Sequence, residues 1–89
     1  MTVVRIPPTL RAEVGGERQV EATGDDVRGV LEDLAARYPQ LGRHLFEAGD
    51  LAPFVNVYVG GEDVRTLDGL ETAVDGRAMI LLPAMAGGS

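Results

Sequence analysis

A single amphipathic helix, set between short strand-like segments, most strongly limits what this chain can fold into. From residue 27 to residue 38 the apolar side chains recur at spacings of three and four, which predicts a helix with one buried face. We expect Thr23 to cap this helix, and Asp25 and Asp26 to lie in its first turn, where the helix dipole favours carboxylates. Pro39 is expected to end it.

Four segments around the helix have the pattern of β-strands. Residues 2–6 and 17–22 flank a Gly-Gly pair and predict a hairpin with a loose turn. Residues 54–59 alternate between valines and larger side chains, and residues 78–82 form the expected last strand. Residues 41–51 are expected to be a loop with at most one helical turn. This order of elements predicts an α+β fold, in which the main helix lies across one face of a mixed sheet.

One helix covers only one face of such a sheet, so the opposite face is expected to be open. Met79 and Leu81 should point toward the helix, and Ile80 and Leu82 should point outward. Exposed apolar side chains that gather on one face are typical of a contact surface. The alternative is that residues 41–51 cover Ile80 and Leu82. The predicted partner-binding patch consists of Phe54, Tyr58, Ile80, Leu82 and Pro83.

The composition narrows the class of partner. The chain has 89 residues, enough for one domain, and a net charge of −6, which disfavours binding to nucleic acid. A protein with a basic groove is a better expected partner. All eight basic side chains are arginines, and the alternation in residues 2–6 places Arg5 outward. No apolar run is long enough to span a membrane and no export signal is recognisable, so we expect a cytoplasmic protein.

The sequence offers no constellation that would make this chain an enzyme. It contains no cysteine, and its one histidine, His44, has no recognisable catalytic partners. The acidic residues do not have the spacing of metal ligands, and the glycine pairs do not form a phosphate-binding loop. We therefore predict no catalytic residues, no metal site and no bound cofactor.

The C-terminal sequence LLPAMAGGS contains the remaining candidate site. We predict a folded domain over residues 1–83 and a flexible tail over residues 84–89, which would reach roughly 20 Å when extended. Glycines lack a Cβ, so Gly87 and Gly88 could pass through a narrow tunnel and leave a carbonyl open to attack. A diglycine near a terminus is also typical of linkers and frayed ends. The tail alone leaves these alternatives open.

Several segments resemble one known family over nearly the whole chain. IPPTLR at 6–11, FVNVYVGGEDVR at 54–65 and LETAVDGRAMILLPAMAGG at 70–88 are similar to the ThiS/MoaD family of ubiquitin-like sulfur carriers, and most similar to its CysO type. The resemblance implies a β-grasp fold with a flexible diglycine tail. The proline after the last strand, followed by AxAGG, is the more specific part of the resemblance.

The family mechanism places the chemistry at the tail. The resemblance implies that a ubiquitin-activating-like adenylyltransferase uses ATP and Mg²⁺ to adenylate the carboxylate of Gly88, while Ala86 and Gly87 thread into its active site. Sulfur then replaces AMP, and the Gly88 thiocarboxylate gives sulfur to a biosynthetic enzyme for cysteine or another metabolite. Ser89 departs from this pattern. Either a processing protease removes Ser89, or Ser89 is an artificial addition, or the chain carries no sulfur.

Three other roles remain open at this point. A chain of this kind could be the small subunit of molybdopterin synthase, which would remain bound to a larger catalytic subunit. It could be a ubiquitin-like modifier that is joined through Gly88 to lysines of other proteins. It could also be an interaction module with an inert tail.

Overall fold

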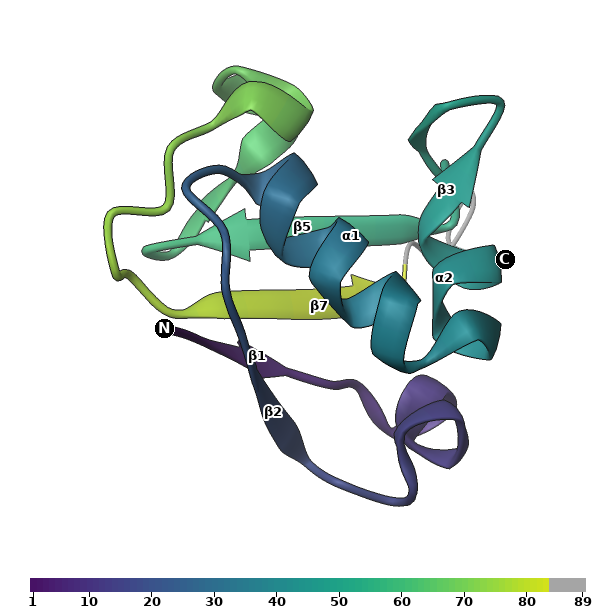
Figure 1. Cartoon of the computed structure of the whole chain (residues 1–89). Helices are drawn as coiled ribbons and strands as arrows, with labels where there is room; N and C mark the ends of the chain where they lie inside the picture. Colours follow the sequence, from purple (N-terminus) through teal and green to yellow (C-terminus); the bar gives the residue numbers. More distant parts are fainter. Residues whose placement is uncertain (84–89) are drawn as a thin grey trace.

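The computed structural model describes residues 1–83, and the predicted tail lies outside this range (Figure 1). Within residues 1–83, no helix combines the length and apolar character that a membrane span requires. The helices are α1 (Val27–Arg37) and α2 (Pro39–Leu45), with three 3-10 helices, η1 (Pro8–Val14), η2 (Val64–Thr66) and η3 (Gly69–Glu71). The strands are β1 (Thr2–Arg5), β2 (Gln19–Ala22), β3 (Phe46–Glu47), β4 (Asp50–Leu51), β5 (Val55–Val59), β6 (Glu62–Asp63) and β7 (Met79–Pro83).

Five of the strands form one mixed sheet in the order β2-β1-β7-β5-β6. β1 pairs antiparallel with β2 and parallel with β7, and β5 pairs antiparallel with both β7 and β6. The predicted hairpin and mixed sheet are therefore confirmed. β7 is the central strand, so the chain approaches its C-terminal segment from the middle of the sheet.

Helix α1 lies across one face of this sheet, as the apolar spacing predicts (Figure 1). The side chains of the helix that point to the sheet are fully buried, and valines of β5 and the inward residues of β7 meet them in the core. The residues at the centre of this core are Val27, Val30, Leu31, Leu34, Val57, Val59, Met79 and Leu81. Burial of each large apolar side chain contributes about 1.5–3 kcal/mol, so this layer is a large source of the stability of the fold.

The N-terminal cap of α1 is Asp26, so the predictions that Thr23 is the cap and that Asp25 and Asp26 lie in the first turn are wrong. Asp26 has extended backbone angles, and its Oδ1 accepts a 2.8 Å hydrogen bond from the backbone N–H of Gly29. This is the contact by which a cap residue satisfies a free N–H of the first turn. Thr23 lies too far before the first helical residue to do so. Its own backbone N–H instead donates to the Asp33 carboxylate at 3.0 Å.

Residues 41–51 are more ordered than the predicted loop. Pro39 ends α1 as expected, but it is also the first residue of α2, a position where its missing N–H has no cost. Leu41 and Leu45 lie one helical turn apart and are fully buried in the core. The small antiparallel ribbon β3–β4 follows directly.

Helices α1 and α2 pack closely at one glycine. A Cβ built on Gly42 would lie 2.7 Å from the Cβ of Ala35 and 3.2 Å from its Cα. These separations are shorter than a normal contact between carbon atoms. The small size of Gly42 therefore sets how closely α2 approaches α1.

Candidate functional site

The open face of the sheet carries part of the predicted partner-binding patch. Across β5 and β7, Tyr58 lies directly opposite Ile80, and Asn56 lies opposite Leu82. Ile80 is half-buried, whereas the side chain of Leu82 is 42% exposed. The prediction that Ile80 and Leu82 point away from the helix is confirmed. Residues 41–51 do not cover them, because α2 packs against α1 on the other side of the sheet (Figure 1).

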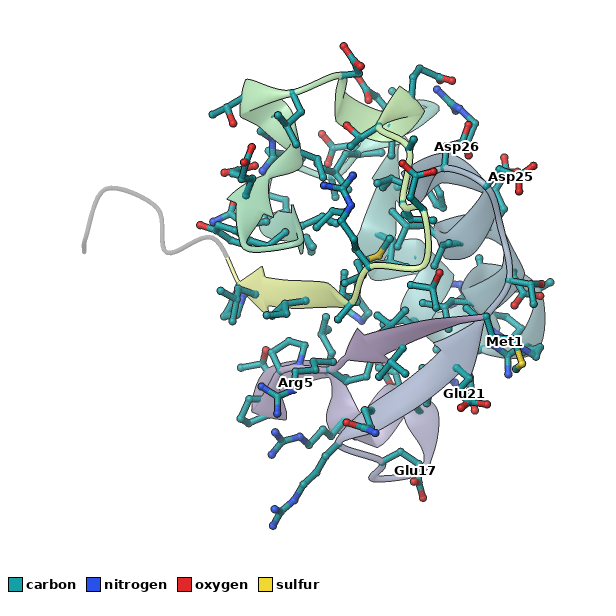
Figure 2. The ribbon with its side chains drawn as sticks, turned by 90° about the vertical axis from the view of Figure 1, so that its left-hand side faces the viewer. Met1, Arg5, Glu17, Glu21, Asp25 and Asp26 are labelled. Carbon is teal, nitrogen blue, oxygen red and sulfur yellow. The ribbon has the colours of Figure 1, made fainter. Side chains whose placement is uncertain are left out.

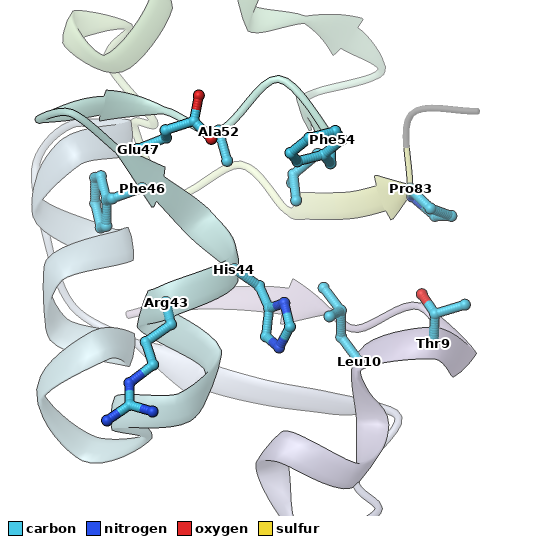
Figure 3. Close-up of a pocket in the computed structure, with 10 residues that line it drawn as sticks. Thr9, Leu10, Arg43, His44, Phe46, Glu47, Ala52, Phe54 and Pro83 are labelled. Atoms are coloured by element: carbon cyan, nitrogen blue, oxygen red, sulfur yellow. The ribbon is translucent and has the colours of Figure 1, made fainter. Parts of the chain in front are cut away.

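The other two residues of the predicted patch lie on a neighbouring surface. Pro83 pairs with the inward-facing Val55, so the two-residue period of β7 puts it on the face opposite Leu82. Phe54 precedes β5, in a turn closed by a hydrogen bond from Val55 N–H to the Ala52 carbonyl, and is 65% exposed. Together Phe54 and Pro83 line a hollow of about 300 Å³ at the end of β7 (Figure 3).

This hollow lies between η1, α2 and the start of β5. Leu10 and Thr9 border it from η1, and Arg43 and His44 border it from α2 (Figure 3). His44 is exposed, and its Nε2 lies 3.1 Å from Oε2 of Glu13. The lining is mainly apolar and carries no set of groups arranged for acid–base chemistry. Among residues 1–83, no cluster of histidine and carboxylate side chains could hold a metal ion.

Two arginines of α1 are paired with carboxylates. The Arg28 guanidinium lies 2.9 Å from the Glu71 carboxylate, and Arg37 lies 3.2 Å from Asp33 one turn earlier on α1. The hydrogen bond from Arg28 to Glu71 raises the pKa of the Arg28 guanidinium above its ordinary value. Both pairs are exposed to solvent, so they contribute little to stability.

Arginines on the open face have a different arrangement. Arg5 lies opposite Ile80 across β1 and β7 and is exposed, which confirms the prediction that Arg5 points outward. Figure 2 shows Arg5 far from Asp25 and Asp26, which directly precede α1. On the other flank, Arg65 donates hydrogen bonds to Asn56 Oδ1 at 2.7 Å and to a backbone carbonyl at 2.8 Å. The open face is thus an apolar strip bordered by guanidinium groups.

Two arginines of this surface had no signal in the sequence that would place them there. Arg11 lies on η1 and Arg18 lies just before β2, and both line a hollow beside Ile80 and Leu82. Periodicity located Arg5 because Arg5 belongs to a strand. Arg11 and Arg18 lie outside the strands, so their position depends on how the connection between β1 and β2 folds.

The predicted chemical site lies outside the described residues. Gly88 as the adenylation and thiocarboxylate site, Ala86 and Gly87 as threading residues, and Ser89 as the processing residue all follow Pro83 in the sequence. Within the described residues, Pro83 ends the central strand, which is held by β1 on one side and β5 on the other. The folded part therefore supplies a rigid base next to a surface suited to protein contact.

Comparison with known proteins identifies the family. The model of the ThiS family matches residues 4–88. The chain is 45% identical over 89 residues to the sulfur carrier protein CysO of Mycobacterium tuberculosis, covering 96% of both chains. It is 41% identical over 80 residues to small archaeal modifier protein 3 of Haloferax volcanii, covering 85% of this chain and 87% of that protein.

Solved structures agree with this match. The crystal structure of the Amycolatopsis orientalis BexX/CysO complex contains a chain that is 43% identical to this one, with a TM-score of 0.90. The likeness covers 99% of this chain and 100% of that one. The relatives named here are carrier or modifier proteins and not enzymes. With its β-grasp fold and a family match over nearly its whole length, the chain belongs to the ThiS family.

Proposed function

We propose that this protein is a sulfur carrier whose Gly88 carboxylate is activated by a partner adenylyltransferase and converted to a thiocarboxylate. The observation that carries this proposal is the likeness to CysO over nearly the entire chain, together with a family match that includes both glycines of the tail. The partner supplies ATP and Mg²⁺. The carrier supplies an anchored tail and a recognition surface.

The chemistry explains why a partner is required. A carboxylate is a poor electrophile, because neither of its oxygens is a good leaving group. When an oxygen of Gly88 attacks the α-phosphorus of ATP, pyrophosphate leaves and an acyl adenylate forms. Sulfide, or a persulfide sulfur from a sulfurtransferase, then attacks the carbonyl carbon, and AMP departs with its bonding electrons. With sulfide, this leaves the thiocarboxylate directly; with a persulfide, a reducing thiol must also cleave the S–S bond.

The tail sequence fits this use. Glycines at positions 87 and 88 leave the carbonyl carbon accessible, and small residues such as Ala86 can pass through a narrow channel. Ser89 would move the reactive carboxylate one residue too far and add a side chain. We therefore propose that a protease removes Ser89 before activation.

The folded domain would bind the activating enzyme through its open face. Tyr58, Ile80 and Leu82 form an apolar strip beside the central strand that leads into the tail. Phe54 and Pro83 border the neighbouring hollow at the end of that strand. A partner that covers both surfaces would hold the base of the tail from two sides.

The sulfur acceptor is proposed to be a biosynthetic enzyme for cysteine or a related sulfur-containing metabolite. Support comes from the 45% identity to the sulfur carrier protein CysO, because the CysO type is the carrier linked to cysteine synthesis. A second candidate function is protein modification through Gly88. The 41% identity to small archaeal modifier protein 3 favours it.

One experiment separates these functions. The form ending at Gly88 is incubated with the adenylyltransferase from the same genome, Mg²⁺ and ATP, and pyrophosphate release is measured with and without sulfide. A carrier should release pyrophosphate with or without sulfide, and it should become sensitive to thiol-alkylating reagents only when sulfide is present. A modifier should instead give isopeptide-linked products when a protein extract of the same organism is added, because lysine amines of other proteins then displace AMP from the Gly88 adenylate. If the enzyme is active and neither product forms, both functions are contradicted.

A further inference from the structure

A hollow on the open face brings three arginines together. It lies between β1, η1, the start of β2 and β7, and has a volume of about 400 Å³. We call it the arginine hollow, and the lining residues that matter here are Arg5, Arg11, Arg18, Gln19, Ile80 and Leu82.

Local contacts explain why the arginines converge. Arg5 ends β1 and lies opposite Ile80 in the parallel pair. The connection from β1 to β2 then turns back, so that the Ile6 N–H donates to the Arg18 carbonyl at 2.9 Å. Arg11 Nε donates to the Ile6 carbonyl at 3.2 Å, which holds this side chain against the same turn.

The described residues contain no acidic partner for this cluster. No carboxylate lines the arginine hollow, and within residues 1–83 none of its three guanidinium groups forms an ion pair. Glu13 and Glu17 lie close to Arg11 and Arg18 in the sequence, but neither lines the hollow, and Glu13 faces His44 instead. This arrangement is unusual in a chain of net charge −6, where acidic side chains outnumber basic ones.

The hollow also has an apolar wall that is partly exposed. Leu82 is 42% exposed and Ile80 is half-buried beside it. Arginines around an apolar centre are typical of protein interfaces, where the guanidinium groups bind carboxylates and the apolar centre excludes water. Unpaired like charges that lie close together repel one another until an external anion compensates them.

We propose that the arginine hollow receives an acidic loop of the adenylyltransferase, with one apolar side chain against Ile80 and Leu82 and carboxylates beside Arg5, Arg11 and Arg18. This inference rests on the proposed function, because it names the chemistry of that partner's contact surface. Nucleic acid is disfavoured because an extended phosphate backbone would also meet the net negative charge of the rest of the chain, whereas a single acidic loop meets the arginine hollow alone.

The test uses charge reversal with a matched control. Arg5→Glu and Arg18→Glu are compared with Arg37→Glu, since Arg37 is also exposed but lies on α1, away from both hollows. Each substitution changes the net charge by the same amount. Pyrophosphate release by the adenylyltransferase is measured against carrier concentration, with every carrier ending at Gly88, at two salt concentrations. Circular dichroism checks that each variant is folded.

We expect Arg5→Glu and Arg18→Glu to raise KM about tenfold at low salt with little change in kcat, and Arg37→Glu to raise it less than about twofold. High salt should reduce the difference between the variants. If all three variants have the same KM while wild type is activated, the arginine hollow is not the docking site, and the proposed function still stands. If wild type is not activated at all, the proposed function and this inference both fail. Binding of a labelled single-stranded oligonucleotide that Arg5→Glu and Arg18→Glu abolish would overturn the inference in favour of nucleic acid.

Discussion

Tyr58 and Ile80 lie directly opposite each other on the open face, where β5 and β7 pair antiparallel. Both side chains are half-buried, so they cover each other in part and still present apolar surface to solvent. Leu82 follows on the same face of the central strand. This strip connects the rigid centre of the sheet to the start of the tail.

Leu82→Asp is expected to weaken binding to the adenylyltransferase about tenfold or more, because it puts a carboxylate into the apolar centre of the proposed interface. Leu67→Asp is the matched control, since Leu67 is 39% exposed, against 42% for Leu82, and lies between η2 and η3. Isothermal titration calorimetry gives both affinities. Equal affinities for the two folded variants would exclude the strip from the interface.

The cap of α1 leads to a prediction about stability. Asp26→Ala removes the acceptor for the Gly29 N–H and should lower the free energy of unfolding by about 1 kcal/mol. Thr23→Ala should change it by less than about 0.5 kcal/mol, because the side chain of Thr23 is exposed and its contact to Asp33 uses the backbone. Urea unfolding of both variants measures the difference. A larger loss for Thr23→Ala would contradict the assignment of the cap.

Gly42→Ala should destabilise the protein by about 1–3 kcal/mol, although alanine is the better helix former. The added methyl group would lie 2.7 Å from the Cβ of Ala35, so α2 would have to move away from α1. Gln40→Ala on the same helix is the control, because Gln40 is exposed. Thermal unfolding should show a clearly lower Tm for Gly42→Ala alone. An unchanged Tm would mean that the two helices can separate at no cost.

Periodicity predicted the parts of the fold in which one face of an element is buried. The spacing of apolar residues located α1, and the alternation around Val57 and Leu81 located the two central strands with the correct faces inward. The helix α2 has only seven residues, and two buried leucines give too short a pattern to distinguish a helix from a loop.

The candidate site was predictable only where it lies on a strand. The outward positions of Ile80, Leu82 and Arg5 follow from alternation. The separate hollow at Phe54 depends on a turn, and the place of Arg18 depends on a hydrogen bond between residues twelve positions apart in the chain. Such contacts form through the tertiary fold, so a local pattern does not contain them.

The central claim is that activation occurs at the carboxylate of a terminal glycine. Two forms of the protein, one ending at Gly88 and one retaining Ser89, are incubated with the adenylyltransferase, Mg²⁺, ATP and sulfide, and their intact masses are compared. The account predicts a gain of about 16 Da, the difference between sulfur and oxygen, for the form ending at Gly88 and no change for the form with Ser89. An equal gain for both forms, or no gain for either with an active enzyme, would contradict it.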